Sequence, residues 1–348
     1  MRLSLRNLSA MAAMVVVVGA CSSSAPTQTS TATISAPSQT ATAVVAESAT
    51  PSSAASVNPC SDKHLVIGII TFSMTDVATN GTVKGAQDEA AKCGYTSSVV
   101  DAQGNDDTVN SAMEDYVQKK VDAIITIVTP SSAIGAGLAA AKAANIPVYT
   151  MGGDFAPGIS AMGDDWMGDI VAARIAKDTG ATGDMLGLVY RGGLPCLKRE
   201  ASYDAMLTAN PGINNQTQQV PVPGQVEAAT AATLAWLAGH PKGKAIWTCF
   251  DDPAMGAIAA LKQDGYTAGQ VLVYGFNGNP DALLAVQAGW MTATLWINHT
   301  KMGADAVDEF AKIIAAGSSW TPITIPSEYV LVDKSNVDEF LQTHPISS

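Results

Sequence analysis

Apolar runs of strand length alternate with amphipathic helical stretches along most of this 348-residue chain. The run "HLVIGIITF" (64–72) is almost continuously apolar, as expected for a parallel strand buried on both faces. The next segment, "GTVKGAQDEAAKCG" (81–94), has the periodicity of an amphipathic helix and ends in a glycine. The alternation continues as "TSSVVDA", "TVNSAMEDYVQKK", "VDAIITIV", "SSAIGAGLAAAKAAN" and "IPVYTM". Repeated β-α units predict a parallel sheet with helices on both faces.

A second β-α series begins near Asp165 and includes the apolar runs "MLGLVY" (185–190), "KAIWTCF" (244–250) and "QVLVYGF" (270–276). The tail continues the alternation and is long enough for the chain to cross between the two halves again. We therefore expect an α/β fold of two doubly wound parallel-sheet lobes. Ligands of such sheets bind beyond the carboxyl ends of the strands, so the residues that follow the strands are the candidate site.

The first twenty residues are predicted to be a lipoprotein signal peptide. Arg2 and Arg6 form a positive segment, and the apolar stretch 11–18 that follows is too short to span a bilayer. The ending "VGAC" resembles a bacterial lipobox, although Val18 stands where leucine is more usual. In a lipobox the cysteine is acylated, which makes Cys21 the expected lipid attachment site. The alternative is a buried N-terminal hairpin with an ordinary cysteine.

Residues 21–59 are predicted to be a disordered tether. Beyond Cys21 they consist almost entirely of Ser, Thr, Ala and Pro, which bury too little surface to offset the entropy of ordering. We therefore expect a bacterial cell-membrane lipoprotein whose globular body lies outside the cytoplasm. Stable attachment then requires more than one acyl chain.

Charge and composition exclude several classes of protein. The chain is acidic, with a formal net charge of −12, and has no basic cluster, so we expect no binding to nucleic acid. The body lacks an apolar run of membrane-spanning length. It also lacks a paired C-x-x-C motif, and the four histidines are scattered, so no metal site and no cofactor are predicted.

Four of the five cysteines remain after Cys21 is assigned to the lipid. An exported chain meets oxidising conditions, so an even number suggests two disulfides. Cys60 precedes the first strand and Cys93 ends the next helix, two points that return to one sheet edge. Cys196 and Cys249 each follow a strand of the second half, at the same edge. We predict the pairs Cys60–Cys93 and Cys196–Cys249; four separate buried thiols are the alternative.

Four further motifs carry a family resemblance over nearly all of residues 64–333. They are "GAQDEAAKCGY", "AANIPVYTM", "FDDPAMGAIAALK" and "VYGFNGNPDALLAVQAG". In this order they resemble the type I periplasmic binding proteins, in particular the ribose-binding sugar receptors. The resemblance implies a two-lobed receptor with a three-strand hinge that closes on a small polar ligand and docks on an ABC permease with its ATPase. We expect the protein to be a monomer. The implied N-terminal lobe is 60–163 plus 298–326, and the C-terminal lobe is 164–297 plus 327–348.

The resemblance also implies ligand contacts, although this chain departs from the family at several positions. Ala78 and Thr79 replace the aromatic pair that stacks on a sugar ring, and Gly152 with Gly153 replaces an Asp-Arg pair. Ordinary ribose is therefore doubtful, and another small sugar or polyol is expected. The positions carried over as ligand-binding are Asp76, Gly152, Asp154, Arg199, Phe250, Asp251, Asn277 and Trp296.

Five of these candidates also have a structural alternative. Asp76 and Asp154 lie where loop aspartates often form caps or turns, and Asp251 is suited to a helix N-cap. Arg199 is adjacent to Lys198 and could be a solvated helix residue. Trp296 could belong to the core.

Other functions compete with that of a receptor for uptake. "GAGLAA" (135–140) matches a dinucleotide-binding pattern, but "TPSS" separates it from the preceding strand, so its glycines would lie inside a helix. No G-x-S-x-G or H-E-x-x-H motif is present, so we expect no enzyme. A sugar-responsive repressor would need a helix-turn-helix where the leader stands. Signalling to a membrane receptor, or binding of a non-sugar hydroxylated metabolite, stays open as an alternative.

Overall fold

The computed structural model describes residues 60–164, 166–317 and 320–346. The predicted signal peptide, the tether and the lipid site Cys21 lie outside the described residues. All described residues fall within one compact unit of the chain.

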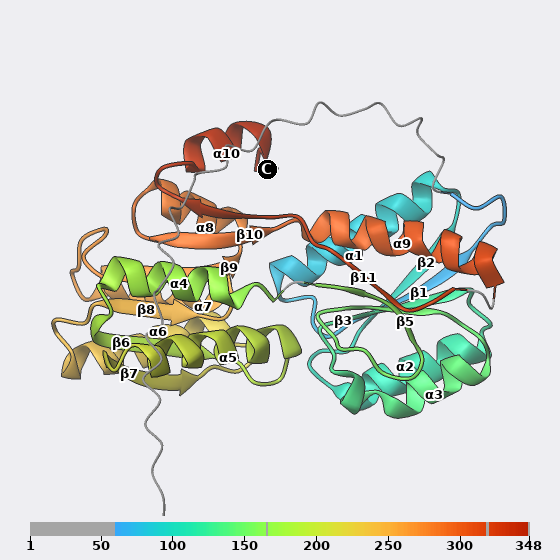
Figure 1. Ribbon diagram of the computed structural model, residues 1–348, viewed down its shortest axis with the longest axis horizontal. Coiled ribbons are helices and arrows are strands. Elements are labelled where there is room, and N and C mark those ends of the chain that lie inside the picture. The colour runs from blue at the N-terminus through green and yellow to red at the C-terminus, as the bar shows by residue number, and fades with distance from the viewer. Residues whose placement is uncertain (1–59, 165, 318–319, 347–348) are drawn as a thin grey trace, which may run out of the picture. The chain divides into compact units, whose positions relative to one another are not determined.

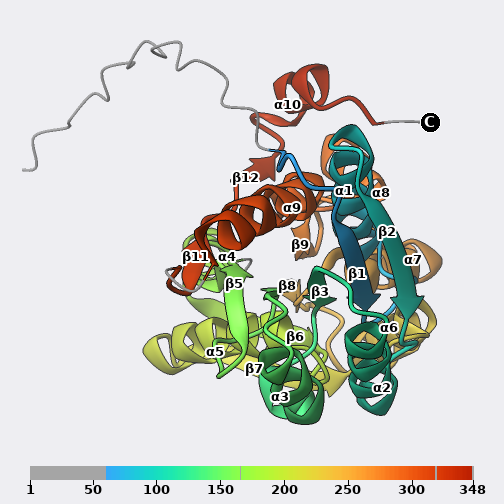
Figure 2. The ribbon, with the colours of Figure 1, turned by 90° about the vertical axis from the view of Figure 1, so that its right-hand side faces the viewer.

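The first sheet has the strand order β11-β5-β4-β3-β1-β2, and its strand pairs are parallel (Figure 1). Helices α1 and α9 pack together on one face, and α2 and α3 pack together on the other, as Figures 1 and 2 both show. The strands are β1 (Val66–Thr71), β2 (Thr96–Asp101), β3 (Ala123–Ile127), β4 (Val148–Met151), β5 (Ile159–Gly163) and β11 (Ile323–Ile325). The helices are α1 (Val77–Lys92), α2 (Asp106–Gln118), the 3-10 turn η1 (Ser131–Ala133), α3 (Gly135–Ala143) and α9 (His299–Ala316).

The second sheet repeats this plan with the order β12-β10-β9-β8-β6-β7. Helix α4 packs against α5, and α6 packs against α7. The strands are β6 (Thr182–Val189), β7 (Gly212–Gln219), β8 (Ala245–Thr248), β9 (Leu272–Asn277), β10 (Ala293–Ile297) and β12 (Tyr329–Asp333). The helices are α4 (Gly168–Thr179), α5 (Leu194–Ala209), α6 (Gln225–Gly239), α7 (Asp251–Gln263), α8 (Pro280–Gln287) and α10 (Val337–Thr343).

The chain passes between the two sheets at three places, after β5, after β10 and after β11. The predicted fold of two doubly wound lobes joined by a three-strand hinge is confirmed. Strand β12 is the exception to parallel pairing, because it runs antiparallel to β10. The carboxyl ends of the parallel strands face the hinge. Since β12 enters its lobe from the hinge, it must run in the opposite direction.

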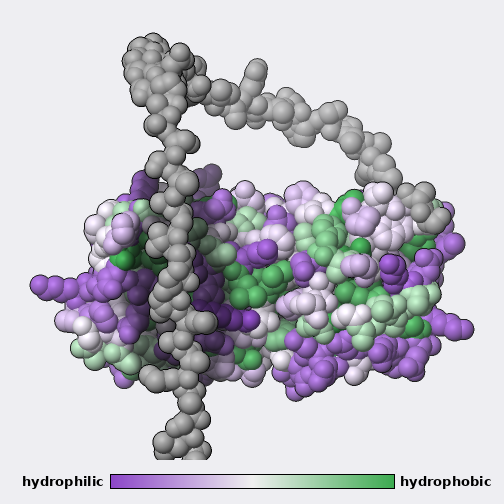
Figure 3. Space-filling view, turned by 60° about the horizontal axis from the view of Figure 1, so that its bottom comes forward, coloured by the Kyte–Doolittle hydropathy of each residue, from purple (hydrophilic) through white to green (hydrophobic). Residues whose placement is uncertain are grey.

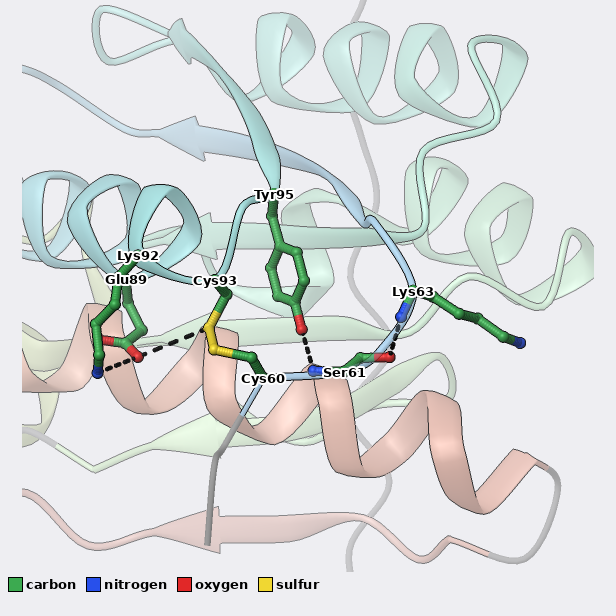
Figure 4. Close-up of a disulfide and its surroundings, with 7 residues drawn as sticks. All are labelled: Cys60, Ser61, Lys63, Glu89, Lys92, Cys93 and Tyr95. Carbon is green, nitrogen blue, oxygen red and sulfur yellow. Dashed lines mark hydrogen bonds and ion pairs between the residues drawn. A yellow bond between two sulfur atoms is a disulfide. The ribbon is translucent and has the colours of Figure 1, made fainter. Parts of the chain in front are cut away.

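Both predicted disulfides are present. Cys60–Cys93 has an S–S distance of 2.00 Å and joins the start of the described chain to the end of α1. In Figure 4 the hydroxyl of Tyr95 also accepts from the backbone N–H of Ser61 beside this disulfide. Cys196–Cys249 links the first turn of α5 to the residue after β8. The alternative of four separate thiols is therefore excluded.

Helix α1 starts earlier than the sequence pattern predicts, and helix α3 contains the glycines of the dinucleotide-like motif. Helix α1 begins at Val77, four residues before the predicted start, because the Asp76 side chain accepts from the Thr79 N–H and caps the helix. Gly137 lies inside α3, where a Cβ would be 2.7 Å from the Cβ of Met113. This glycine therefore allows α3 to pack closely against α2, and it does not form a dinucleotide-binding turn.

The surface is mixed in polarity. Hydrophilic and hydrophobic residues are interspersed over the face shown in Figure 3. Among the described residues, none of the helices combines the length and apolar character that crossing a membrane requires.

Candidate functional site

A cavity lies between the lobes, at the carboxyl ends of strands from both sheets, where α/β folds bind their ligands. Its empty volume is about 540 Å³, and this figure includes space that is open to solvent. The first lobe lines it with Phe72, Ser73, Asp76, Ala78, Thr79, Val128, Met151 and His299, and the second with Tyr190, Gly193, Pro195, Cys196, Arg199, Val222, Phe250 and Asn277.

Asp76 has two oxygens with different roles. Its Oδ2 accepts from the Thr79 N–H at 2.8 Å and caps α1. Its Oδ1 is buried and has no hydrogen-bond partner among the described residues. Burial raises the pKa of Asp76, while hydrogen bonds to the α1 N-terminus and the charge of Arg199 lower it in part. The residue is thus a helix cap that also brings a spare acceptor to the cavity.

Arg199 comes from α5 of the other lobe and is 2% exposed, so it is not a solvated helix residue. Its Nη1 donates to the carbonyl of Cys249 at 2.8 Å and to Oδ1 of Asn277 at 3.2 Å. The guanidinium also lies 4.7 Å from the centre of the Phe276 ring. These contacts hold a positive charge in the cavity wall, on the lobe opposite Asp76.

Asn277 ends β9 in a left-handed conformation, with φ of 98°. Asparagine tolerates positive φ better than most residues, so this position suits its backbone as well as its amide. The next residue, Gly278, also has positive φ, and a Cβ there would lie 2.5 Å from the Cβ of Trp296. The tight turn directs the chain away from the cavity immediately after Asn277.

His299 is a cavity residue that the sequence reasoning missed. It is buried at the start of α9, and neither ring nitrogen has a hydrogen-bond partner among the described residues. Burial, together with the charge of Arg199, lowers the pKa of His299 to about 3. The ring is therefore neutral at pH 7 and offers one donor and one acceptor. Its position directly after a hinge strand was the available signal.

Aromatic side chains reach the cavity from positions that the resemblance did not indicate. Phe72 follows β1 and Tyr190 follows β6, and their ring centroids are 6.2 Å apart across the lobes. Phe250, which was predicted, precedes α7 and is 6% exposed. Burial and the charge of Asp106 raise the pKa of Tyr190 to about 12, so its hydroxyl stays protonated. Together these rings supply the apolar surface that is missing at Ala78 and Thr79.

Gly152 and Asp154 do not line the cavity. Gly152 is buried, has φ of 65° and directly follows the lining residue Met151. Oδ1 of Asp154 accepts from the Ser131 N–H at 2.9 Å, which ties the loop after β4 to the turn η1.

Asp251 and Trp296 also lie outside the lining. Asp251 is fully buried and accepts from the Asn279 N–H and the Thr294 hydroxyl, each at 2.8 Å. Burial raises the pKa of Asp251 well above its ordinary value. The Trp296 ring packs 5.1 Å from the ring of Phe340, on the side of the sheet that carries α10. Of the eight predicted ligand residues, the cavity therefore brings together Asp76, Arg199, Phe250 and Asn277.

Comparison with known proteins gives consistent matches. The family described as the periplasmic binding protein domain matches residues 67–318. The ribose import binding protein RbsB of Bacillus subtilis (strain 168) is 29% identical over 251 residues, which cover 70% of this chain and 80% of that protein. The xylitol-binding protein of Mycolicibacterium smegmatis is 27% identical over 246 residues, covering 67% of this chain and 68% of that protein.

Solved structures share the fold. An ABC transporter solute-binding protein from Agrobacterium vitis with bound allitol has a TM-score of 0.74 at 24% identity, and the match covers 81% of this chain and 99% of that one. The Caulobacter myo-inositol binding protein has a TM-score of 0.73 at 22% identity, with 80% of this chain and 97% of that one covered.

Proposed function

Because the chain belongs to the periplasmic binding protein family, we propose that it is an extracytoplasmic receptor that captures a small sugar or polyol and delivers it to an ABC importer. Support comes from relatives named for ribose import and xylitol binding, and from related structures with allitol and myo-inositol. The solute-binding character of these proteins supports a binding role over an enzymatic one.

One observation carries the proposal: the cavity holds a carboxylate from one lobe and a guanidinium from the other. A hydroxyl group donates and accepts at once, so it can bond to Asp76 and to Arg199. Only a closed arrangement lets both lobes contact one ligand, and binding therefore favours closure. The permease would then recognise the closed surface. Ligand contact by Gly152, Asp154, Asp251 and Trp296 stays a prediction.

The lobe boundaries proposed from the sequence are 60–163 plus 298–326 and 164–297 plus 327–348. We further propose that residues 1–20 are cleaved, that Cys21 carries the lipid and that 21–59 tether a monomeric body to the membrane. Mass spectrometry of the mature protein should then find Cys21 at the N-terminus with acyl chains attached. A mature chain that begins elsewhere, or a Cys21 without acyl chains, would refute lipid attachment at Cys21.

A thermal-shift screen against pentoses, hexoses, polyols and sugar acids, followed by calorimetry, tests the receptor function. A ligand that binds only the folded chain raises the Tm. We expect a Kd on the order of micromolar, or about −8 kcal/mol. If no compound of the panel raises the Tm or releases heat, the receptor function is wrong.

Sensing is the second candidate, since the same fold can report its closed state to a membrane receptor. Deletion of the chain distinguishes the two. Loss of uptake of the labelled ligand indicates transport. Unchanged uptake with a lost response to the ligand indicates sensing.

A further inference from the structure

Most of the cavity wall is apolar. Hydrophobic side chains approach from both lobes, so a ligand in the cavity would meet carbon on opposite sides. These side chains include Phe72, Val128, Met151, Tyr190, Val222 and Phe250.

The polar groups of the wall are few, and some are already engaged within the protein. The Thr79 hydroxyl donates to the Ser73 carbonyl at 2.5 Å, and the Ser73 hydroxyl bonds to that of Thr75 at 2.8 Å. Among the described residues of the lining, buried side-chain atoms with unused hydrogen-bonding capacity belong to Asp76 and His299. Both residues belong to the first lobe, where Asp76 caps α1 and His299 begins α9.

Fully hydroxylated sugars are poorly matched to this wall. Their hydroxyls point outward all around the ring, and each one pressed against carbon loses its bonds to water. A buried hydroxyl without a partner is enough to weaken binding about tenfold. A C–H or methyl group at the same place gains from burial instead.

The charged side chains that line the cavity favour an uncharged ligand. The Asp76 carboxylate and the Arg199 guanidinium have opposite signs and come from opposite lobes. Their charges balance, so neither an acidic nor a basic ligand finds a net counter-charge.

We propose that the ligand is an uncharged amphipathic sugar derivative: a deoxy sugar or a methyl glycoside whose hydroxyls bond to Asp76, His299 and Arg199 while its deoxygenated or methylated side rests on the apolar wall. This inference rests on the proposed sugar-receptor function and narrows its ligand class. Oδ1 of Asp76 and the ring nitrogens of His299 have no hydrogen-bond partner among the described residues, so the ligand hydroxyls are expected beside them.

Calorimetry with matched sugar pairs tests the inference on the purified full chain. The pairs are D-fucose with D-galactose, L-rhamnose with L-mannose, and methyl β-D-xyloside with D-xylose. The members of each pair differ by one hydroxyl or one methyl group. We expect the deoxy or methylated member of at least one pair to bind tenfold or more tightly than its parent, by the estimate above.

A polar substitution in the wall provides a second arm. Val222→Thr keeps the side-chain shape but replaces a methyl group with a hydroxyl. It should therefore reduce severalfold the preference for the deoxy or methylated sugar over its parent. Val66→Thr is the matched control, because Val66 is an exposed residue at the start of β1 outside the cavity lining, and it should leave the preference unchanged.

Three outcomes overturn the inference, and one of them also overturns the function. Parent sugars that bind as tightly as their partners in every pair refute the amphipathic ligand but leave a sugar receptor standing. An unchanged preference in Val222→Thr refutes the role of the wall. Absence of binding heat from all pairs refutes the inference. If no sugar or polyol of the wider panel binds either, the receptor function is refuted as well.

Discussion

Asp76→Asn separates the two roles of this side chain, because each of its oxygens does a different task. The amide oxygen of asparagine can still accept from the Thr79 N–H and cap α1, as Oδ2 of Asp76 does at 2.8 Å. The amide nitrogen then replaces the buried Oδ1, which has no partner among the described residues. The substitution therefore exchanges an acceptor in the cavity for a donor and removes the negative charge.

The expected loss is that of one hydrogen bond to a charged group, about 1.5–3 kcal/mol. This free energy corresponds to a roughly 10- to 150-fold rise in the Kd. Stability should be unchanged or slightly higher, because burial already raises the pKa of Asp76 and so disfavours its charged form in the folded chain. Asp76→Ala should lose the same affinity and also the cap, which contributes about 1 kcal/mol.

Calorimetry with the tightest ligand of the screen measures affinity, and the Tm without ligand measures stability. Asn105 is the matched control, since it caps α2 by accepting from the N–H groups of Asp107 and Thr108 and is absent from the cavity lining. Asn105→Ala should lower the Tm and leave the Kd unchanged. An unaltered Kd in Asp76→Asn would show that Oδ1 does not meet the ligand and would refute the reasoning.

Three further predictions follow from the same geometry. The unfolded chain takes up a proton on His299 below the ordinary pKa of 6.5, whereas the folded chain does so only near pH 3, so stability falls as the pH drops from 6.5 to 3. His299→Phe should reduce that fall, measured by denaturant titration, and should weaken ligand binding. A pH dependence identical to that of the wild type would contradict a neutral buried ring. A Cβ at Gly193 would lie 2.8 Å from Cγ1 of Val128 in the other lobe, so Gly193→Leu should hinder closure and raise the Kd without changing the Tm of the unliganded chain; wild-type affinity would show that the lobes do not meet there. Replacing both Cys196 and Cys249 with alanine opens a loop with a sequence separation of 53 and should lower the free energy of unfolding by about 2–5 kcal/mol; unchanged denaturation in urea would contradict it.

The fold was predictable because its determinants are local in the sequence. Continuous apolar runs such as 64–72 identify buried parallel strands, and the amphipathic segments between them identify the covering helices. The disulfides followed from the same logic, since Cys60 and Cys93 occupy the two ends of one strand-helix return. The antiparallel β12 was not predicted, because its direction depends on where the chain re-enters the second lobe.

The site was predictable only in part, because its lining depends on how the two lobes meet. Arg199 and Asn277 were found because they stand where the resemblance places polar residues, and both line the cavity. Phe72, Tyr190 and His299 each come after a strand, which was the available signal. Which of the residues after strands face the cavity, however, depends on how the two lobes meet. Asp251 follows a strand as a site residue would, yet its bonds to Asn279 and Thr294 turn it into the interior.

A crystal structure with the best sugar of the screen tests the central claim most directly, namely that the two lobes hold one hydroxylated ligand between them. We expect the ligand in the cavity, with one of its hydroxyls within hydrogen-bond distance of Oδ1 of Asp76 and another bonded to Arg199. Ligand density bound to one lobe alone, or outside the cavity, would contradict the claim.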